Sequence, residues 1–305
     1  MHPSAPIFDS AFLSKLEQLS LLSRKLFRGE HHAERKSRQT GSSLEFADFR
    51  NYTSGDDLRA VDWNIYGRLD RLVVKLFEQE QDLQIDFLID ASPSMRWQPP
   101  KARGGTLPPS KLDAACRIAA SLSYIGLANL DRVNLHWFGD ALRADLGLSR
   151  GKSQFHKVLD FLRTPPPPEG ETRLTASVRT FTQRLKRRGL VFILSDLLDP
   201  AGYQEALDLL RHSQFEVQVI HVLDPGELRP DLSGDLRLIE VETQAALEVT
   251  AHDTLLRRYE QEVDRFLEEA AQFCLKRGIG YVRALNSVPF EDLVLRVLRD
   301  GRMLQ

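Results

Sequence analysis

The chain has 305 residues, of which 42% are hydrophobic and 28% charged, the composition of an ordinary folded protein. Its formal net charge of -2 excludes a globally basic nucleic-acid-binding protein, and we expect no nucleic-acid partner. No stretch approaches the roughly 20 apolar residues that cross a bilayer, and no basic start precedes an apolar core. We therefore expect a cytoplasmic protein without a membrane span.

Residues 1–80 are predicted to form an N-terminal helix followed by an accessory segment. Leucines at helical spacing predict a helix over residues 10–28, and a basic stretch ends near residue 38. Residues 41–80 interleave aromatic side chains with arginines, a pattern that can stack nucleic-acid bases. The carboxylates of Asp48, Asp56, Asp57 and Asp62 in the same stretch oppose a phosphate backbone, so internal ion pairs of a small lobe explain these residues better. An alternating pattern over 72–77 predicts a strand that leads towards the central one.

The stretch from Leu83 to Met95 predicts a buried strand that ends abruptly in oxygen-bearing side chains. A short apolar run stops at Asp90, and Ser92 and Ser94 follow at alternate positions, with Pro93 between them. Open α/β sheets bind ligands beyond the carboxyl ends of their strands. Carboxylate and hydroxyl oxygens suit a magnesium-type ion. The alternative is a turn whose Asp and Ser cap the next helix.

The rest of the chain alternates predicted helices and strands, which indicates an α/β fold. The pattern is typical of a doubly wound, mostly parallel sheet, and residues 81–305 are predicted to form this domain. A hairpin is expected to be inserted at about 232–250. Predicted helices cover 110–129, 153–162, 174–187, 203–213, 254–277 and 290–299, and predicted strands cover 133–138, 190–194, 215–223 and 279–285.

Other chemistries lack the residues they need. The sequence contains no phosphate-binding glycine loop, no dinucleotide-binding glycine motif, no G-x-S-x-G nucleophile motif and no H-E-x-x-H zinc motif. Cys116 and Cys274 could form one disulfide, but two buried thiols are the better reading. The second apolar strand ends at Ser195 and Asp196, and a hydroxyl is available in the Gly170-Glu171-Thr172 loop. The remaining candidate is an oxygen-ligand site.

These motifs resemble known families. D-x-S-x-S after the first core strand, Thr172 before a helix and Asp196 after a later strand resemble the metal-ion-dependent adhesion site (MIDAS) of the von Willebrand factor A domain. That resemblance implies a doubly wound sheet of Rossmann type and a metal site made of Asp90, Ser92, Ser94, Thr172 and Asp196. The metal would be Mg²⁺, with Mn²⁺ or Ca²⁺ as alternatives.

A wider pattern, L-E-F-A-D-F-R-N-Y-T-S-G-D-D-L-R-A-V-D-W-N followed by D-A-S-P-S-M, closely resembles the bacterial DUF58 family. Members of that family typically pair with MoxR-type AAA+ ATPases, which implies the same partner here. Two features depart from the family: the 96–109 loop is long, and Glu171 stands where a second glycine is common.

The predicted function is binding rather than catalysis. Two carboxylates and three neutral hydroxyls leave a divalent ion short of anionic ligands, and an acidic residue of a protein partner can complete it. We expect a non-enzymatic adaptor that works with a MoxR-type ATPase in chaperone-like assembly or maturation of clients. The alternative is a metal-assisted phosphoester hydrolase at the same site, for which two metals about 4 Å apart would be diagnostic.

Overall fold

The computed structural model describes residues 8–19, 45–53, 55–78, 83–98, 109–168, 170–185 and 187–300. It divides into two compact units, one formed by residues 27–82 and the other by Met1–Leu26 together with Leu83–Gln305. The basic stretch near residues 24–38 and residues 99–108 of the predicted loop lie outside the described residues.

The smaller unit contains a two-stranded antiparallel sheet and short helices. Strand β1 (Glu45–Asn51) pairs with β2 (Val73–Glu78), and helix α2 (Trp63–Leu69) lies between them in the chain. The Asp62 side chain caps α2 by accepting hydrogen bonds from two backbone amides of its first turn. The strand predicted over 72–77 corresponds to β2, which precedes β3 in the chain and pairs with β1 in a sheet of its own.

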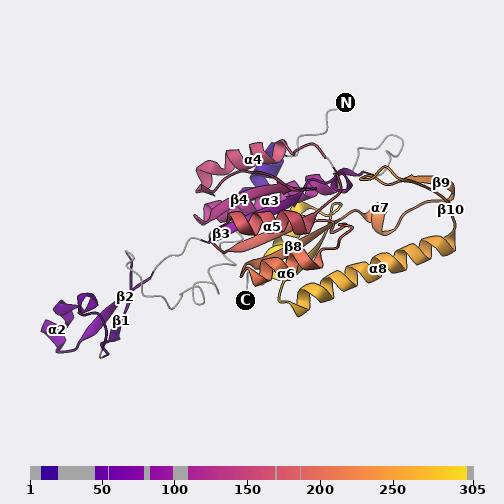
Figure 1. The fold of residues 1–305 in the computed structure, drawn as a ribbon. Helices are drawn as coiled ribbons and strands as arrows, with labels where there is room; N and C mark the ends of the chain where they lie inside the picture. Colours follow the sequence, from indigo (N-terminus) through magenta and orange to yellow (C-terminus); the bar gives the residue numbers. More distant parts are fainter. Residues whose placement is uncertain are drawn as a thin grey trace. The chain divides into compact units, whose positions relative to one another are not determined.

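The larger unit is built on a mixed sheet of seven strands, most of them parallel (Figure 1). The hydrogen-bonded order is β11-β8-β7-β3-β4-β5, and β6 also pairs with β4. Only β5 and β6 run antiparallel to their neighbour. The strands are β3 (Gln84–Asp90), β4 (Arg132–Phe138), β5 (Leu142–Asp145), β6 (Ser149–Arg150), β7 (Leu190–Ser195), β8 (Glu216–Leu223) and β11 (Gly280–Leu285).

Strand β3 lies in the middle of this sheet because its apolar run is buried on both faces. All seven of its residues are buried, and Phe87 stacks on Phe192 of the adjacent β7 with ring centroids 5.0 Å apart. A continuous apolar run is the pattern of a strand covered by helices on both sides. The predicted α/β class with a mostly parallel sheet is therefore confirmed.

Two groups of helices cover the sheet. Helix α3 (Lys111–Ala128) contacts α4 (Phe155–Arg163) and α9 (Phe290–Asp300). Helices α5 (Leu174–Arg184), α6 (Gln204–His212) and α8 (Asp253–Lys276) contribute to a second apolar core against β7 and β8. The buried thiols Cys116 and Cys274 are both free, and they lie in α3 and α8.

The N-terminal helix belongs to the larger unit. Residues 10–19 are helical, and Phe12 packs on Phe290 of α9 with ring centroids 4.6 Å apart. This differs from the predicted 1–80 segment, because apolar contacts to the far end of the chain place the helix with the core. The predicted late insertion corresponds to the hairpin of β9 (Gly234–Ile239) and β10 (Ala246–Ala251), which follows the short helix α7 (Pro225–Leu228).

Candidate functional site

Three predicted ligands lie together where the central strand ends. Asp90 is the last residue of β3 and is fully buried. Its Oδ1 accepts a hydrogen bond from the Ser92 amide at 2.9 Å, and the Ser92 and Ser94 hydroxyl oxygens are 2.9 Å apart. Ser94 begins a single 3₁₀ turn, which Met95 anchors by inserting fully into the core. The turn therefore holds a carboxylate and two hydroxyls in one place.

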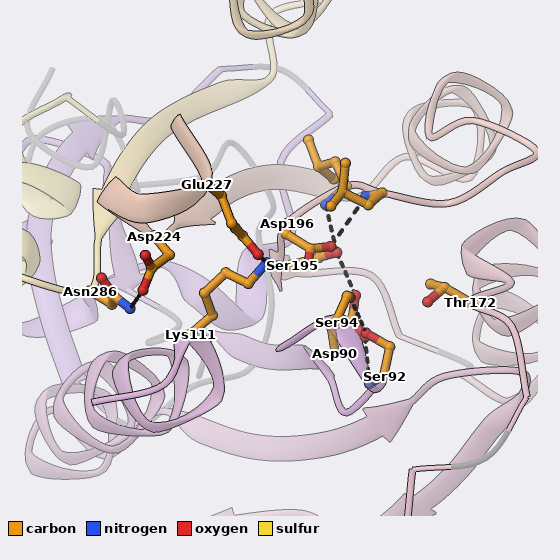
Figure 2. A network of polar contacts seen from close by, with 12 residues as sticks. Asp90, Ser92, Ser94, Lys111, Thr172, Ser195, Asp196, Asp224, Glu227 and Asn286 are labelled. Carbon is orange, nitrogen blue, oxygen red and sulfur yellow. Dashed lines mark hydrogen bonds and ion pairs between the residues drawn. The ribbon is translucent and has the colours of Figure 1, made fainter. Parts of the chain in front are cut away.

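Asp196 is brought beside them by the pairing of β7 with β3. Ile89 pairs with Leu194, so the residues that follow the two strands are neighbours. The Ser195 hydroxyl donates to Asp90 Oδ2 at 2.6 Å and so links the two strand ends directly (Figure 2). Asp196 itself is 2% exposed.

A buried lysine that was not among the predicted site residues shares this site. Lys111, the first residue of α3, is completely buried, and its Nζ donates to Asp196 Oδ2 at 2.8 Å and to Glu227 Oε1 at 2.5 Å. A cation in the first turn of a helix is unfavourable with the helix dipole. A lysine directly after the Ser110 cap was therefore the feature of the sequence that could have indicated a pairing of Lys111 with buried carboxylates.

The charges of this group are unevenly balanced. Burial, and then the negative charge of Asp196, raise the pKa of Asp90 to about 7. Burial alone would lower the pKa of Lys111, but Asp196 and Glu227 outweigh it and raise that pKa above its ordinary value. Two carboxylates, those of Asp196 and Glu227, thus contact the Lys111 ammonium group. Asp90 instead accepts hydrogen bonds from the Ser92 amide and the Ser195 hydroxyl.

Thr172 reaches the same edge of the sheet from a different loop. The Arg173 amide donates to the carbonyl of Gly139 at 2.8 Å, and Gly139 directly follows β4, whose last residue pairs with Asp90. Figure 2 shows Thr172 on one side of Asp90 and Ser92, with Lys111 and Glu227 on the other. The Thr172 amide and hydroxyl donate to the Glu242 carboxylate, at 3.0 and 2.7 Å.

The structure therefore joins four of the predicted ligands closely and gives the fifth an unexpected partner. Asp90, Ser92 and Ser94 are linked directly, and Asp196 is linked through its neighbour Ser195. Glu242, which lies in the turn between β9 and β10, had no signal in the sequence, because its contact spans 70 residues.

The donor set suits a hard divalent cation that depends on hydroxyl ligands. Within the described ranges, no three His, Cys, Asp or Glu side chains are grouped to hold a metal ion. A cation at this edge would therefore need the serine and threonine oxygens in addition to Asp90 and Asp196. Such oxygen donors are typical of Mg²⁺ and Ca²⁺ sites rather than zinc sites.

The neighbouring strand ends continue the polar edge. Asp224 follows β8, and its Oδ2 accepts a hydrogen bond from the Asn286 amide group at 2.6 Å. Asn286 follows β11 and also donates to the carbonyl of Pro109 at 2.9 Å. These contacts fix the chain that enters α3, and hence the backbone that carries Lys111.

Curated relatives cover most of the chain. An uncharacterized protein of Mycobacterium tuberculosis and one of Mycobacterium bovis are each 25% identical over 252 residues, which is 82% of this chain and 77% of theirs. An uncharacterized protein of Mycobacterium avium is 32% identical over 139 residues, which is 45% of this chain and 75% of its own.

Solved structures with similar chains have low identity. An aerotolerance-related membrane protein from Bacteroides fragilis matches at 15% identity and a TM-score of 0.46, and the conserved hypothetical protein BatB from Bacteroides thetaiotaomicron matches at 14% and 0.44. Each match covers 72% of this chain and 99% of the other. A membrane spanning protein from Vibrio fischeri matches at 17% identity and a TM-score of 0.24, over 72% of this chain and 98% of its own.

The predicted cytoplasmic location is contradicted by these neighbours, two of which are described as membrane proteins. Among the helices that the structure describes, none has the length and apolarity to cross a bilayer. The family model of DUF58, described as a protein of unknown function, matches residues 48–268. This chain belongs to the DUF58 family.

Proposed function

We propose that this chain is a metal-dependent protein-interaction module of the von Willebrand factor A type. In this proposal Asp90, Ser92, Ser94, Thr172 and Asp196 hold one divalent cation, Mg²⁺, in an arrangement like a MIDAS. The observation that carries the proposal is the buried Asp90 at the end of the central strand, which accepts hydrogen bonds from the Ser92 amide and the Ser195 hydroxyl, in the same turn as the paired Ser92 and Ser94 hydroxyls. When bound, the cation supplies a coordination position for an acidic residue of a partner.

The two carboxylates have different roles in this proposal. Among the described residues, the Ser92 amide and the Ser195 hydroxyl donate to Asp90, and neither is charged, so a cation would supply the positive charge that this carboxylate lacks. Asp196 already accepts from Lys111 through Oδ2 and from the Leu198 amide through Oδ1. We therefore assign direct ligation to Asp90 and a water-mediated role to Asp196.

The position of Lys111 argues against a two-metal hydrolase. A second divalent ion would need carboxylates beyond Asp90, and those available are Asp196 and Glu227. Both already neutralise the Lys111 ammonium, which is 2.8 Å from one and 2.5 Å from the other. The ammonium thus takes the place of a second cation, which favours one metal and a binding role.

The proposed partner is a MoxR-type AAA+ ATPase, with which the chain would act as an adaptor in the assembly or maturation of client proteins. The resemblance to the DUF58 family supports this choice of partner. The cation at the strand ends and an Asp or Glu of the ATPase would form the centre of the interface.

Calorimetry tests the metal and the partner separately. Mn²⁺ should bind the wild-type protein, and Asp90→Asn should weaken its binding at least tenfold, because the substitution removes the carboxylate that is proposed to ligate the cation directly. Asp160→Asn, at an exposed position of α4, is the matched control and should bind Mn²⁺ like wild type. The purified ATPase should bind in Mg²⁺ and not in excess chelator. Equal Mn²⁺ affinity of wild type and Asp90→Asn would refute the metal site.

A further inference from the structure

Glu242 makes a bidentate contact with a residue of the proposed site. Its Oε1 accepts from the Thr172 hydroxyl at 2.7 Å and its Oε2 from the Thr172 amide at 3.0 Å. Thr172 is 3% exposed, so this carboxylate is held at a buried hydroxyl and not at a loose surface group. Hydrogen bonds to an ionised acceptor are about twice as strong as neutral ones.

Glu242 supplies the same chemical group, a carboxylate, that a partner protein is proposed to bring to the site. A partner that completes the proposed site would bring an Asp or Glu carboxylate to the loop that contains Thr172. Glu242 brings such a carboxylate from within the chain, across 70 residues of sequence. A hydroxyl that donates its proton to one carboxylate still has lone pairs for a cation. The contact is therefore compatible with a metal at Thr172.

The hairpin that carries Glu242 is weakly attached to the rest of the unit. Strands β9 and β10 form a two-stranded sheet of their own. Nine of their twelve residues are exposed, two are half-buried, and only Ala251 is buried. Isolated two-stranded hairpins are marginally stable in water. Elements with few buried apolar contacts open at a small free-energy cost. The Glu242 contact is thus an anchor that can be made and released.

We propose that Glu242 is a resident acidic ligand of the site, which the carboxylate of a partner protein must displace. This inference rests on the proposed function. While Glu242 contacts Thr172, the site is closed to an external carboxylate. The apparent dissociation constant for the partner then equals the intrinsic constant divided by the fraction of molecules in which Glu242 is released. The hairpin thereby sets the affinity of the site.

The first test needs no partner. Hydrogen–deuterium exchange of the Thr172 amide and of residues 234–251 is measured in Mg²⁺ and in chelator for wild type, Glu242→Ala and Glu248→Gln. Glu248 is an exposed carboxylate on the same hairpin, so its variant is the matched control. Loss of the charged acceptor in Glu242→Ala should speed exchange of the Thr172 amide at least fivefold, roughly the effect of one charge-assisted hydrogen bond in a half-exposed setting. In wild type, Mg²⁺ should slow exchange of the hairpin.

The second test uses the purified ATPase in Mg²⁺. Glu242→Ala should bind it about tenfold more tightly than wild type, and Glu248→Gln should bind it like wild type. The inference would be overturned if the Thr172 amide exchanged at the same rate in Glu242→Ala and in wild type. It would also be overturned if Mg²⁺ did not change the exchange rate of the hairpin in wild type. If Asp90→Asn still loses Mn²⁺ affinity in that case, the proposed site stands without a resident ligand. Equal Mn²⁺ affinity of wild type and Asp90→Asn would instead refute the proposed function itself, and with it the regulation.

Discussion

Replacing Lys111 with methionine is expected to destabilise the protein by about 3–5 kcal/mol, the range for removing one partner of a buried ion pair. Methionine matches the lysine stem in length, so the packing of α3 is kept while the charge is removed. Asp196 is 2% exposed and would be left as a buried carboxylate without its cation. Glu227 is 26% exposed and can regain water, so most of the cost arises at Asp196.

Urea unfolding at pH 8 in chelator measures this loss as a shift of the midpoint at unchanged slope. Lys276→Met, at an exposed position in the last turn of α8, is the control and should lie within about 0.5 kcal/mol of wild type. The double variant Lys111→Met with Asp196→Asn should recover more than half of the loss, because both charges are then gone. A loss below about 1 kcal/mol for Lys111→Met, or no recovery in the double variant, would show that the pair is not buried as described.

Three further predictions concern stability. Burial lowers the pKa of His221 to about 4, so the folded protein binds fewer protons than the unfolded chain between pH 6.5 and 4, and stability falls as the pH drops through that window. His221→Gln should remove about 3 kcal/mol of this acid sensitivity in urea titrations at several pH values. Gly189→Ala would place a methyl group 2.2 Å from the carbonyl oxygen of Gln84, and the thermal midpoint should fall by an amount equivalent to about 1–3 kcal/mol or more. Ser110→Ala removes the side chain that caps α3 and should cost about 1 kcal/mol in urea.

The prediction for His221 concerns the difference in pH-dependent stability between His221→Gln and wild type. The raised pKa of Asp90 acts in the opposite direction, because the folded protein binds more protons there than the unfolded chain does between pH 7 and about 4. Comparing His221→Gln with wild type in chelator cancels this contribution. An identical dependence of stability on pH in the two proteins would contradict the assignment to His221. An unchanged thermal midpoint of Gly189→Ala would contradict the prediction for Gly189. A loss of stability in Ser110→Ala no larger than that for replacing an exposed serine would contradict the prediction for Ser110.

Local sequence patterns determined the elements of the larger unit and where its polar residues fall. The apolar run that ends at Asp90 became the central strand β3, with Ser92 and Ser94 in the turn after it. The strand predicted to end at Ser195 became β7. The helix predicted at residues 110–129 is α3, capped by Ser110. These features were predictable because hydrophobic period, capping and turn chemistry act between residues a few positions apart.

Pairings between distant segments were decided by the tertiary structure alone. Nothing local indicates that β2 pairs with β1, since an alternating strand fits any sheet with one covered face. The contact of Lys111 with Asp196 joins residues 85 positions apart, and that of Thr172 with Glu242 joins residues 70 apart. Each depends on strand order and on which loops meet at the carboxyl edge of the sheet. A single sequence carries no short-range signal for these choices, because they follow from how the whole core packs.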